Sequence, residues 1–335
     1  MSEKYVQEKD MRGIRWSIAI PPEVKCEYAG TSIGEYFQDI EVMLETEEVS
    51  RQKFVDLYQY DPGEYLYVPL TAYEGVAALG AQLVFTDEHE VMIHNQGNIL
   101  LSIDQINTLK PADPSKYPRF DWAIEAYGEL KKKFPNKPIG LSAGQEGPVT
   151  TAVLLRGTQF FLDCYDAPEL AHKLLNVVTE TFLRFNLAVR KVTGQNSGAV
   201  GIADDHAGNL TPKMWDEFVL PYYERIYSEL GTRTRVMHTE LVRREHLAYL
   251  KKLKLALIDF GEDQYLTVKD ALTLGVPFSW HIKTCQVMLM GNPDLVKQSY
   301  EQAVTEGAKA ILTELCVGVP PENIRAFIEI AKRYE

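Results

Sequence analysis

Short apolar runs typical of β-strands alternate with amphipathic helical segments along this chain, and this alternation restricts its fold more than any other feature. Such an order favours parallel β/α units over an antiparallel sheet, because each helix carries the chain back to the start of the next strand. Eight runs are predicted as strands: LYVP (66–69), AQLVF (81–85), PIGLS (138–142), AVGIA (199–203), RVMH (235–238), ALIDF (256–260), PFSWH (277–281) and KAILT (309–313).

Several helices between these runs have recognisable ends. Residues 31–60 carry an apolar stripe at helical spacing, and a longer amphipathic segment covers 167–192. Thr211 before Pro212 is typical of a helix start, as is Asn292 before Pro293. Since no linker divides the chain, we expect one domain: a (β/α)8 TIM barrel over 63–335 that follows an N-terminal helical extension over 1–62. A doubly wound open sheet is the alternative, but its Gly-rich nucleotide turn is not found in the sequence.

Charge and cysteine content exclude several classes of protein. The 335 residues include 35 basic and 47 acidic side chains, a net charge of -12. This balance argues against nucleic acid and anionic membrane as partners, because both require clustered Lys and Arg. The sequence contains no apolar run of about 18 residues, as a spanning helix needs, and its four cysteines form no CxxC pair. We therefore expect a cytoplasmic protein with reduced thiols that acts on small molecules.

Candidate functional residues follow the apolar runs, since reacting groups in a β/α barrel lie at the C-terminal ends of the strands. The residues at these positions are His94, Asn95, Gln145, Glu146, Asp204, Asp205, His206, His238, Glu240, Asp259, Glu262, Trp280, His281 and Cys316.

His238, Glu240 and Cys316 stand out because together they offer an imidazole, a carboxylate and a thiolate. A spacing of two residues at a strand end lets His238 and Glu240 point to the same side, and Cys316 follows the last predicted strand. Zinc accepts all three ligand types, and three protein ligands leave a fourth position open for water or substrate. The alternative is that the HxE spacing arises by chance and His238 is merely a hydrogen-bonded pocket residue.

Three segments carry a resemblance to a known family: GIADDHAGNLTPKMWDEFVLPYYERIY, VMHTELV and ILTELCVGVPPENIRAFIEIAKRY. They are similar to the uroporphyrinogen decarboxylase superfamily, in particular its corrinoid methyltransferase branch, and the resemblance implies an α/β barrel. In methylcobalamin:coenzyme M methyltransferases of that branch, a His-x-Cys pair and a distant Cys hold zinc. His238 matches the family histidine and Cys316 the distant cysteine, whereas Glu240 stands in place of the first cysteine.

The departure at Glu240 bears on the reaction. A carboxylate in place of a thiolate makes zinc harder and more electrophilic, which suits an ether oxygen better than a thiol. The resemblance then implies a zinc-dependent O-demethylase methyltransferase, which moves methyl from a methyl aryl ether to a Co(I) corrinoid. The Asp-x-His-x-x-Gly signature of corrinoid-binding proteins does not occur in the sequence, so we expect the corrinoid (cobalamin) to arrive on a partner corrinoid protein.

The remaining candidates receive roles around this centre. Asp204, Asp205 and Glu262 are predicted catalytic residues that position substrate or deliver a proton, although a loop carboxylate can instead serve only to cap backbone amides. Side chains predicted to contact substrate or cofactor are His94, Asn95, Glu146, His206, Trp280 and His281.

Three other functions remain open from the sequence. Methyl transfer from corrinoid to a thiol such as coenzyme M would favour a thiolate-rich zinc site, which Glu240 counts against. Porphyrinogen decarboxylation would require cationic side chains for several carboxylates, and the Arg-bearing N-terminal motif of those enzymes is not found. A carrier that retains the barrel without turnover is the third.

Overall fold

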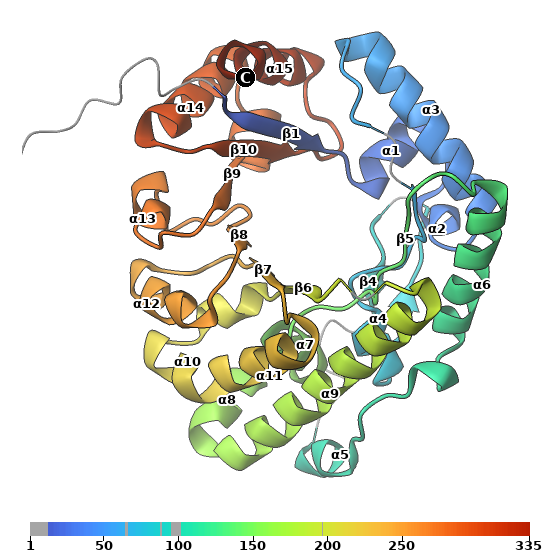
Figure 1. Ribbon diagram of the computed structural model, residues 1–335, viewed down its shortest axis with the longest axis vertical. Helices are drawn as coiled ribbons and strands as arrows, with labels where there is room; N and C mark the ends of the chain where they lie inside the picture. Colours follow the sequence, from blue (N-terminus) through green and yellow to red (C-terminus); the bar gives the residue numbers. More distant parts are fainter. Residues whose placement is uncertain (1–12, 64–65, 88, 95–101, 196) are drawn as a thin grey trace, which may run out of the picture.

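The computed structural model describes residues 13–335 except 64–65, 88, 95–101 and 196. Helices surround a ring of strands in the view of Figure 1. Six parallel strands form one sheet in the order β1-β10-β9-β8-β7-β6, and β2 pairs with β5 in parallel. The ring strands are β1 (Arg15–Ala19), β2 (Leu66–Tyr67), β5 (Ile139–Gly140), β6 (Ala199–Ala203), β7 (Thr234–His238), β8 (Leu257–Asp259), β9 (Phe278–Ile282) and β10 (Ala310–Glu314).

This arrangement confirms the predicted α/β class and TIM-barrel architecture. Across the described residues, hydrogen-bonded ladders join the strands as one group of six and one pair rather than as a closed circle of eight. Seven of the eight predicted runs correspond to ring strands.

Two strand predictions are corrected. The first 62 residues are not only a helical extension, since β1 pairs with β10 from Arg15↔Ala310 to Ala19↔Glu314. The pattern RWSIA hid this strand because its residues alternate in exposure, with polar or small Arg15, Ser17 and Ala19 on one side. The AQLVF run forms β3 (Leu83–Val84), which pairs antiparallel with β4 (Met92–Ile93) in a hairpin separate from the ring.

The helices begin and end near the predicted positions. Asn292 caps α14 by accepting from the Leu295 amide, and Gly194 ends α9 in the left-handed conformation. The helices are α1 (Pro22–Ala29), α2 (Ile33–Tyr36), α3 (Ile40–Tyr58), α4 (Glu74–Ala78), α5 (Ile103–Thr108), α6 (Pro118–Lys133), α7 (Pro148–Arg156), α8 (Gln159–Asp166), α9 (Pro168–Thr193), α10 (Pro212–Phe218), α11 (Leu220–Leu230), α12 (Leu247–Leu250), α13 (Val268–Leu272), α14 (Pro293–Glu306) and α15 (Pro321–Tyr334); short 3-10 and π turns include η3 (Asp205–Asn209) and η6 (Thr284–Leu289).

The main core lies between the strands and the surrounding helices. In β6, Val200 and Ile202 are buried, whereas Ala199 and Gly201 on the opposite face are exposed. Because side chains alternate across a strand, the apolar half packs under the helices and the small half faces the interior of the ring. Space therefore remains inside the ring near β6.

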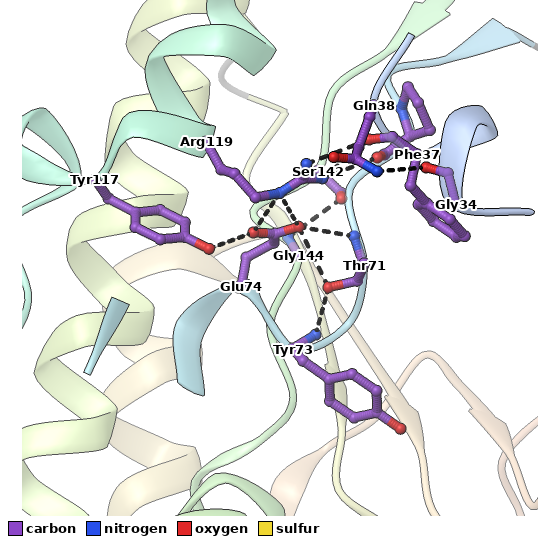
Figure 2. Close-up of polar contacts among 11 residues, drawn as sticks. Gly34, Phe37, Gln38, Thr71, Tyr73, Glu74, Tyr117, Arg119, Ser142 and Gly144 are labelled. Atoms are coloured by element: carbon purple, nitrogen blue, oxygen red, sulfur yellow. Dashed lines mark hydrogen bonds and ion pairs between the residues drawn. The ribbon is translucent and has the colours of Figure 1, made fainter. Parts of the chain in front are cut away.

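A buried ion pair joins the N-terminal region, α4 and α6 (Figure 2). The Glu74 carboxylate is 1 % exposed and accepts from Tyr117 Oη at 2.6 Å and from Arg119 Nε at 3.0 Å. The Thr71 amide and hydroxyl also donate to it, and Arg119 donates to the Phe37 carbonyl oxygen at 3.2 Å. The Glu74–Arg119 pair thus connects the loop after α2, the loop after β2 and the start of α6.

Within the described residues, every helix is too short or too polar to cross a membrane.

Candidate active site at the strand ends

The site centres on an imidazole–carboxylate–imidazole chain at the C-terminal ends of β7, β8 and β9. Asp259 Oδ2 lies 3.1 Å from His238 Nδ1, and its other oxygen lies 2.7 Å from His281 Nε2. Asp205, which follows β6, places Oδ1 3.4 Å from His238 Nε2. Parallel strands bring these residues together because their carboxyl ends meet at one rim of the ring.

Carboxylates on both sides of His238 control its protonation. Burial alone would lower its pKa, but the hydrogen bond with Asp259 and the charge of Asp205 outweigh burial and raise the pKa to about 9. Burial likewise opposes ionisation of Asp259, yet hydrogen bonds from His238 and His281 hold the pKa of Asp259 below its ordinary value. The two carboxylates therefore hold the His238 ring in place and favour its imidazolium form when no metal is bound.

Asp204 has a structural task. It is fully buried, and its carboxylate accepts from the Val149 amide at 2.9 Å and from the Thr150 amide and hydroxyl at 2.7 and 2.8 Å. These donors lie at the start of α7, where backbone amides lack helical partners. Gly147 packs against the same side chain, since an added Cβ would lie 2.5 Å from Asp204 Cβ. Asp204 therefore fixes the start of α7, and its catalytic role stays a prediction.

Glu146 is the carboxyl group best prepared to hold a proton. Its Oε2 is buried and has no hydrogen-bond partner among the described residues. Burial, followed by the charges of Asp205 and Asp204, raises the pKa of Glu146 to about 8, although His238 partly offsets them. Glu146 is thus mostly protonated at neutral pH and lies beside the central imidazole. Sequence analysis predicted it as a binding residue, whereas its environment suits a general acid.

The predicted zinc ligands come together only in part. Glu240 and His238 share the rim, and each affects the other's pKa through its charge. Glu240 Oε1 accepts from the Glu262 amide at 2.7 Å, and Glu262 in turn accepts from the Thr284 amide. Cys316 instead lines a recess with residues of α1, α3 and α15. In the part of the chain that the structure describes, no three His, Cys, Asp or Glu side chains are grouped closely enough to hold a metal ion.

Three other predicted contact residues that the structure describes lie outside this chain of groups. His206 lines a cavity of about 490 Å3 with residues of β4 and α7, and its Nδ1 lies 3.2 Å from Asn209 Nδ2. His94 is exposed at the end of the β3–β4 hairpin, and Asn95 lies outside the described residues. Trp280 packs against the main core, because it faces away from the side on which His281 meets Asp259.

The rim as a whole is acidic. Its carboxylates influence one another's protonation, and the cations that act on them are two histidines and one lysine. Burial raises the pKa of Glu240 and of Glu314, and neighbouring carboxylates add to this effect. The groups are Glu146, Asp204, Asp205, Glu240, Asp259, Glu262 and Glu314, with His238, His281 and Lys283 as the cations.

Two residues at these strand ends received no role from the sequence. Asp259, a candidate from its position after the run ALI, ends β8 and connects both histidines, a role that the sequence did not indicate. Gln145 precedes Glu146, and both polar atoms of its amide are buried without a partner among the described residues.

Fold and site together define an α/β barrel with a titratable centre at the C-terminal ends of parallel strands. The family model for uroporphyrinogen decarboxylase (URO-D) matches residues 14–334. The chain therefore belongs to the uroporphyrinogen decarboxylase family.

Curated relatives agree with this assignment, and a solved structure shares the fold. The uroporphyrinogen decarboxylase of Prochlorococcus marinus (strain NATL1A) is 25% identical over 245 residues, which cover 69% of this chain and 68% of that enzyme. The enzyme of Xylella fastidiosa is 38% identical over 78 residues, so this match spans 23% of the chain and only 21% of that relative's length. The structure of a methyltransferase from Methanosarcina mazei superimposes with a TM-score of 0.71 at 18% identity and covers 96% of this chain and 94% of that one. This likeness shows the shared fold.

Proposed function

We propose that this protein is a methyltransferase that moves a methyl group from a methyl aryl ether to the Co(I) corrinoid of a partner protein. The observation that carries the proposal is Glu146, whose Oε2 is buried without a partner among the described residues and whose pKa is raised to about 8 by burial and neighbouring carboxylates. The methyltransferase among the solved structures supports the barrel as a scaffold for such a reaction.

The charge of the rim favours this reaction over decarboxylation of a porphyrinogen. A porphyrinogen substrate carries several carboxylates, and like charges at short range in a poorly solvated site repel strongly. Among the residues that the structure describes, the carboxylates of the rim outnumber His238, His281 and Lys283, the cations that act on them. A neutral ether avoids this repulsion. The proposed substrate class therefore differs from that named for the decarboxylase relatives.

The reaction balances with one proton. Co(I) supplies the electron pair of the new cobalt–carbon bond and becomes Co(III), while the pair of the breaking carbon–oxygen bond remains on the ether oxygen. Glu146 gives its proton to that oxygen, so the products are a phenol and methyl-Co(III) corrinoid. The carboxylate left on Glu146 then lies beside protonated His238, whose charge stabilises it. Water restores the proton after product release.

The other charged groups of the site fix the positions of Glu146 and His238 and favour their protonated forms. Asp259 fixes the His238 ring through Nδ1 and keeps it protonated. Asp204 holds the start of α7, which follows Glu146 directly in the chain. Asp205 raises the pKa of both Glu146 and His238. Of the predicted catalytic residues, we retain Asp205 as an electrostatic partner and give Asp204 and Glu262 positioning roles.

The proposal includes zinc, which requires that all three predicted ligands come together. His238 and Glu240 already share the rim, and the loop after β10 would have to bring Cys316 to them. When bound by these three residues, zinc would act as a Lewis acid on the ether oxygen. As the described residues stand, the third ligand does not fit, and the steps above therefore use only side chains of the protein.

The proposal is tested by anaerobic incubation of the protein with methoxyphenols and Co(I) cobalamin, with phenol release and methylcobalamin absorbance as readouts. We expect both products in equal amounts, and a loss of about 100-fold or more in Glu146→Gln. Glu301→Gln, the same change on the exposed face of α14, is the matched control. Conversion of uroporphyrinogen without any methyl transfer would overturn the proposal.

A further inference from the structure

Two cysteines lie at matching positions beyond the ends of β9 and β10. The parallel ladder places residues 311–313 of β10 beside residues 280–282 of β9. Continued in the same register, it brings Cys316 beside Cys285. Neighbouring strands lie about 4.7–4.9 Å apart, and the Cα atoms of a disulfide lie about 4.4–6.8 Å apart. The register therefore puts the two thiols at a separation that a disulfide can bridge.

Contacts on both sides of the cysteines show that the two chain segments stay together after the strands end. Before the cysteines, Thr284 Oγ1 donates to the Glu314 carbonyl oxygen at 2.6 Å. After them, Gly318 lies against η6, since an added Cβ would lie 3.7 Å from Leu289 Cδ1. The start of η6 and the loop after β10 are thus held side by side over the stretch that contains both thiols.

The two thiols differ in their access to solvent. Cys285 is exposed, whereas Cys316 is half-buried and lines a recess of about 380 Å3. Cys26 and Cys164 are both buried. Burial, followed by the charge of Cys285, raises the pKa of Cys316, so the two sulfur atoms also lie within electrostatic reach of each other. The pair therefore combines one thiol that a reagent can approach with a second thiol that is shielded beside it.

We propose that Cys285 and Cys316 form a reversible disulfide by exchange with a small-molecule disulfide, which makes the pair a redox modification site. In the first step, the Cys285 thiolate attacks one sulfur of the external disulfide and releases a thiolate. In the second step, the Cys316 thiolate attacks Cys285 Sγ and releases the other thiolate. The two protein sulfurs are oxidised, the external disulfide is reduced to two thiols, and the protons of the protein thiols pass to these products.

The disulfide would connect η6 to the loop after β10 and consume the thiol of Cys316. Disulfides in reducing compartments are usually transient and serve redox sensing or catalysis, which fits a pair with one exposed member. Oxidation would also withdraw Cys316 from the proposed zinc ligands. The inference goes beyond the proposed function and does not depend on it, because it concerns only the two thiols and their separation.

Thiol exchange on the full chain tests the inference. The reduced protein is incubated with millimolar glutathione disulfide and EDTA, so that a metal on Cys316 does not block the reaction. Remaining thiols are then alkylated in denaturant, and peptides are mapped by mass spectrometry without reduction. We expect a bond between the peptides of Cys285 and Cys316 within one chain, no retained glutathione, and full reversal by excess dithiothreitol.

Variants assign the order of attack. Cys316→Ser should keep glutathione on Cys285, at least about tenfold more than the wild type keeps, because the neighbouring thiol that displaces it is missing. Cys285→Ser should leave Cys316 largely unmodified, since the half-buried thiol is then the only member of the pair. Cys164→Ala removes a buried thiol of α8 and is the matched control, which should react like the wild type.

The wild-type peptide map alone decides the inference, so a variant that fails to fold leaves the test intact. Glutathione kept on Cys285 of the wild type would overturn it, because the neighbouring thiol would then be out of reach. A bond between two chains, a bond that involves Cys26 or Cys164, or complete alkylation of Cys285 and Cys316 would overturn it as well.

Discussion

Replacing Glu74 by Gln is the sharpest test of how the fold positions the site. The substitution keeps the size of the side chain but removes the charge that Arg119 faces at 3.0 Å. Glu74 is 1 % exposed and the Arg119 side chain 19 %, so water replaces little of the lost interaction. Removing one partner of a buried pair typically costs about 3–5 kcal/mol. Because Arg119 retains the Phe37 carbonyl oxygen and stacks over Phe85 and Trp122, we expect about 3 kcal/mol here.

The assay is equilibrium unfolding in urea, with the midpoint shifted and the slope unchanged. For a chain of this length, about 3 kcal/mol corresponds to a fall in melting temperature of roughly 4 °C. Glu41→Gln is the matched control, since its ion pair with Lys133 at 2.8 Å is largely exposed and should contribute little. A double change of Glu74→Gln with Arg119→Met should cost less than the sum of the single changes.

The reasoning is refuted if Glu74→Gln unfolds at the same urea concentration as the wild type, or if it behaves like Glu41→Gln. A second readout connects stability to the site. Gly144 lies against Glu74, since an added Cβ would lie 2.6 Å from Glu74 Cγ, and the loop continues directly into Gln145 and Glu146. Disturbing the Glu74–Arg119 pair should therefore lower the rate of the proposed methyl transfer even where the protein remains folded.

Three further predictions concern the rim. The methyl-transfer rate should fall as pH rises through about 8, since Glu146 must be protonated, and a pH-rate profile without this limb would contradict its role as acid. Asp259→Asn should lower the pKa of His238, as read by NMR titration. The raised pKa of wild-type His238 stabilises the fold fully below about pH 6.5, and this effect is lost as the pH rises through about 9. The difference in unfolding free energy between the wild type and Asp259→Asn should therefore narrow over that pH range. A constant difference would argue against the coupling of Asp259 and His238. The zinc proposal predicts about one zinc per chain by elemental analysis, and this zinc should be lost in both Glu240→Ala and Cys316→Ala. Active protein without zinc would contradict the zinc proposal and favour the mechanism in which Glu146 alone supplies the proton.

The fold could be predicted well from the sequence where local pattern and packing agree. Long apolar runs such as AVGIA, followed by capped helices, identified the strands whose ends form the rim. The pattern failed for β1, because a strand with polar or small residues on its inner face does not read as an apolar run. It also failed for AQLVF, since strand propensity alone does not distinguish a ring strand from a hairpin.

The site could be predicted only as a set of residue types near one rim. Asp204 and Asp205 are neighbours in sequence, yet one is buried under the α7 amides and the other faces His238. The direction of the backbone after β6 decides which of the two carboxylates is buried and which faces His238. No local sequence pattern indicates that direction. Cys316 differs for a related reason, because the path of the loop after β10 determines which recess its thiol enters.

The crowding of carboxylates on which the proposed substrate class rests also raises the pKa of the proposed proton donor. Burial and repulsion by neighbouring carboxylates raise the pKa of Glu146 to about 8, whereas attraction to Asp259 and Asp205 outweighs burial and raises the pKa of His238 to about 9. An acid of this strength can protonate a departing phenoxide at neutral pH, whereas an exposed glutamate would already be ionised. The acidic rim and the proton donor are therefore one feature. A cationic cluster suited to porphyrinogen carboxylates would lower the pKa of Glu146 and remove the proton that this reaction needs.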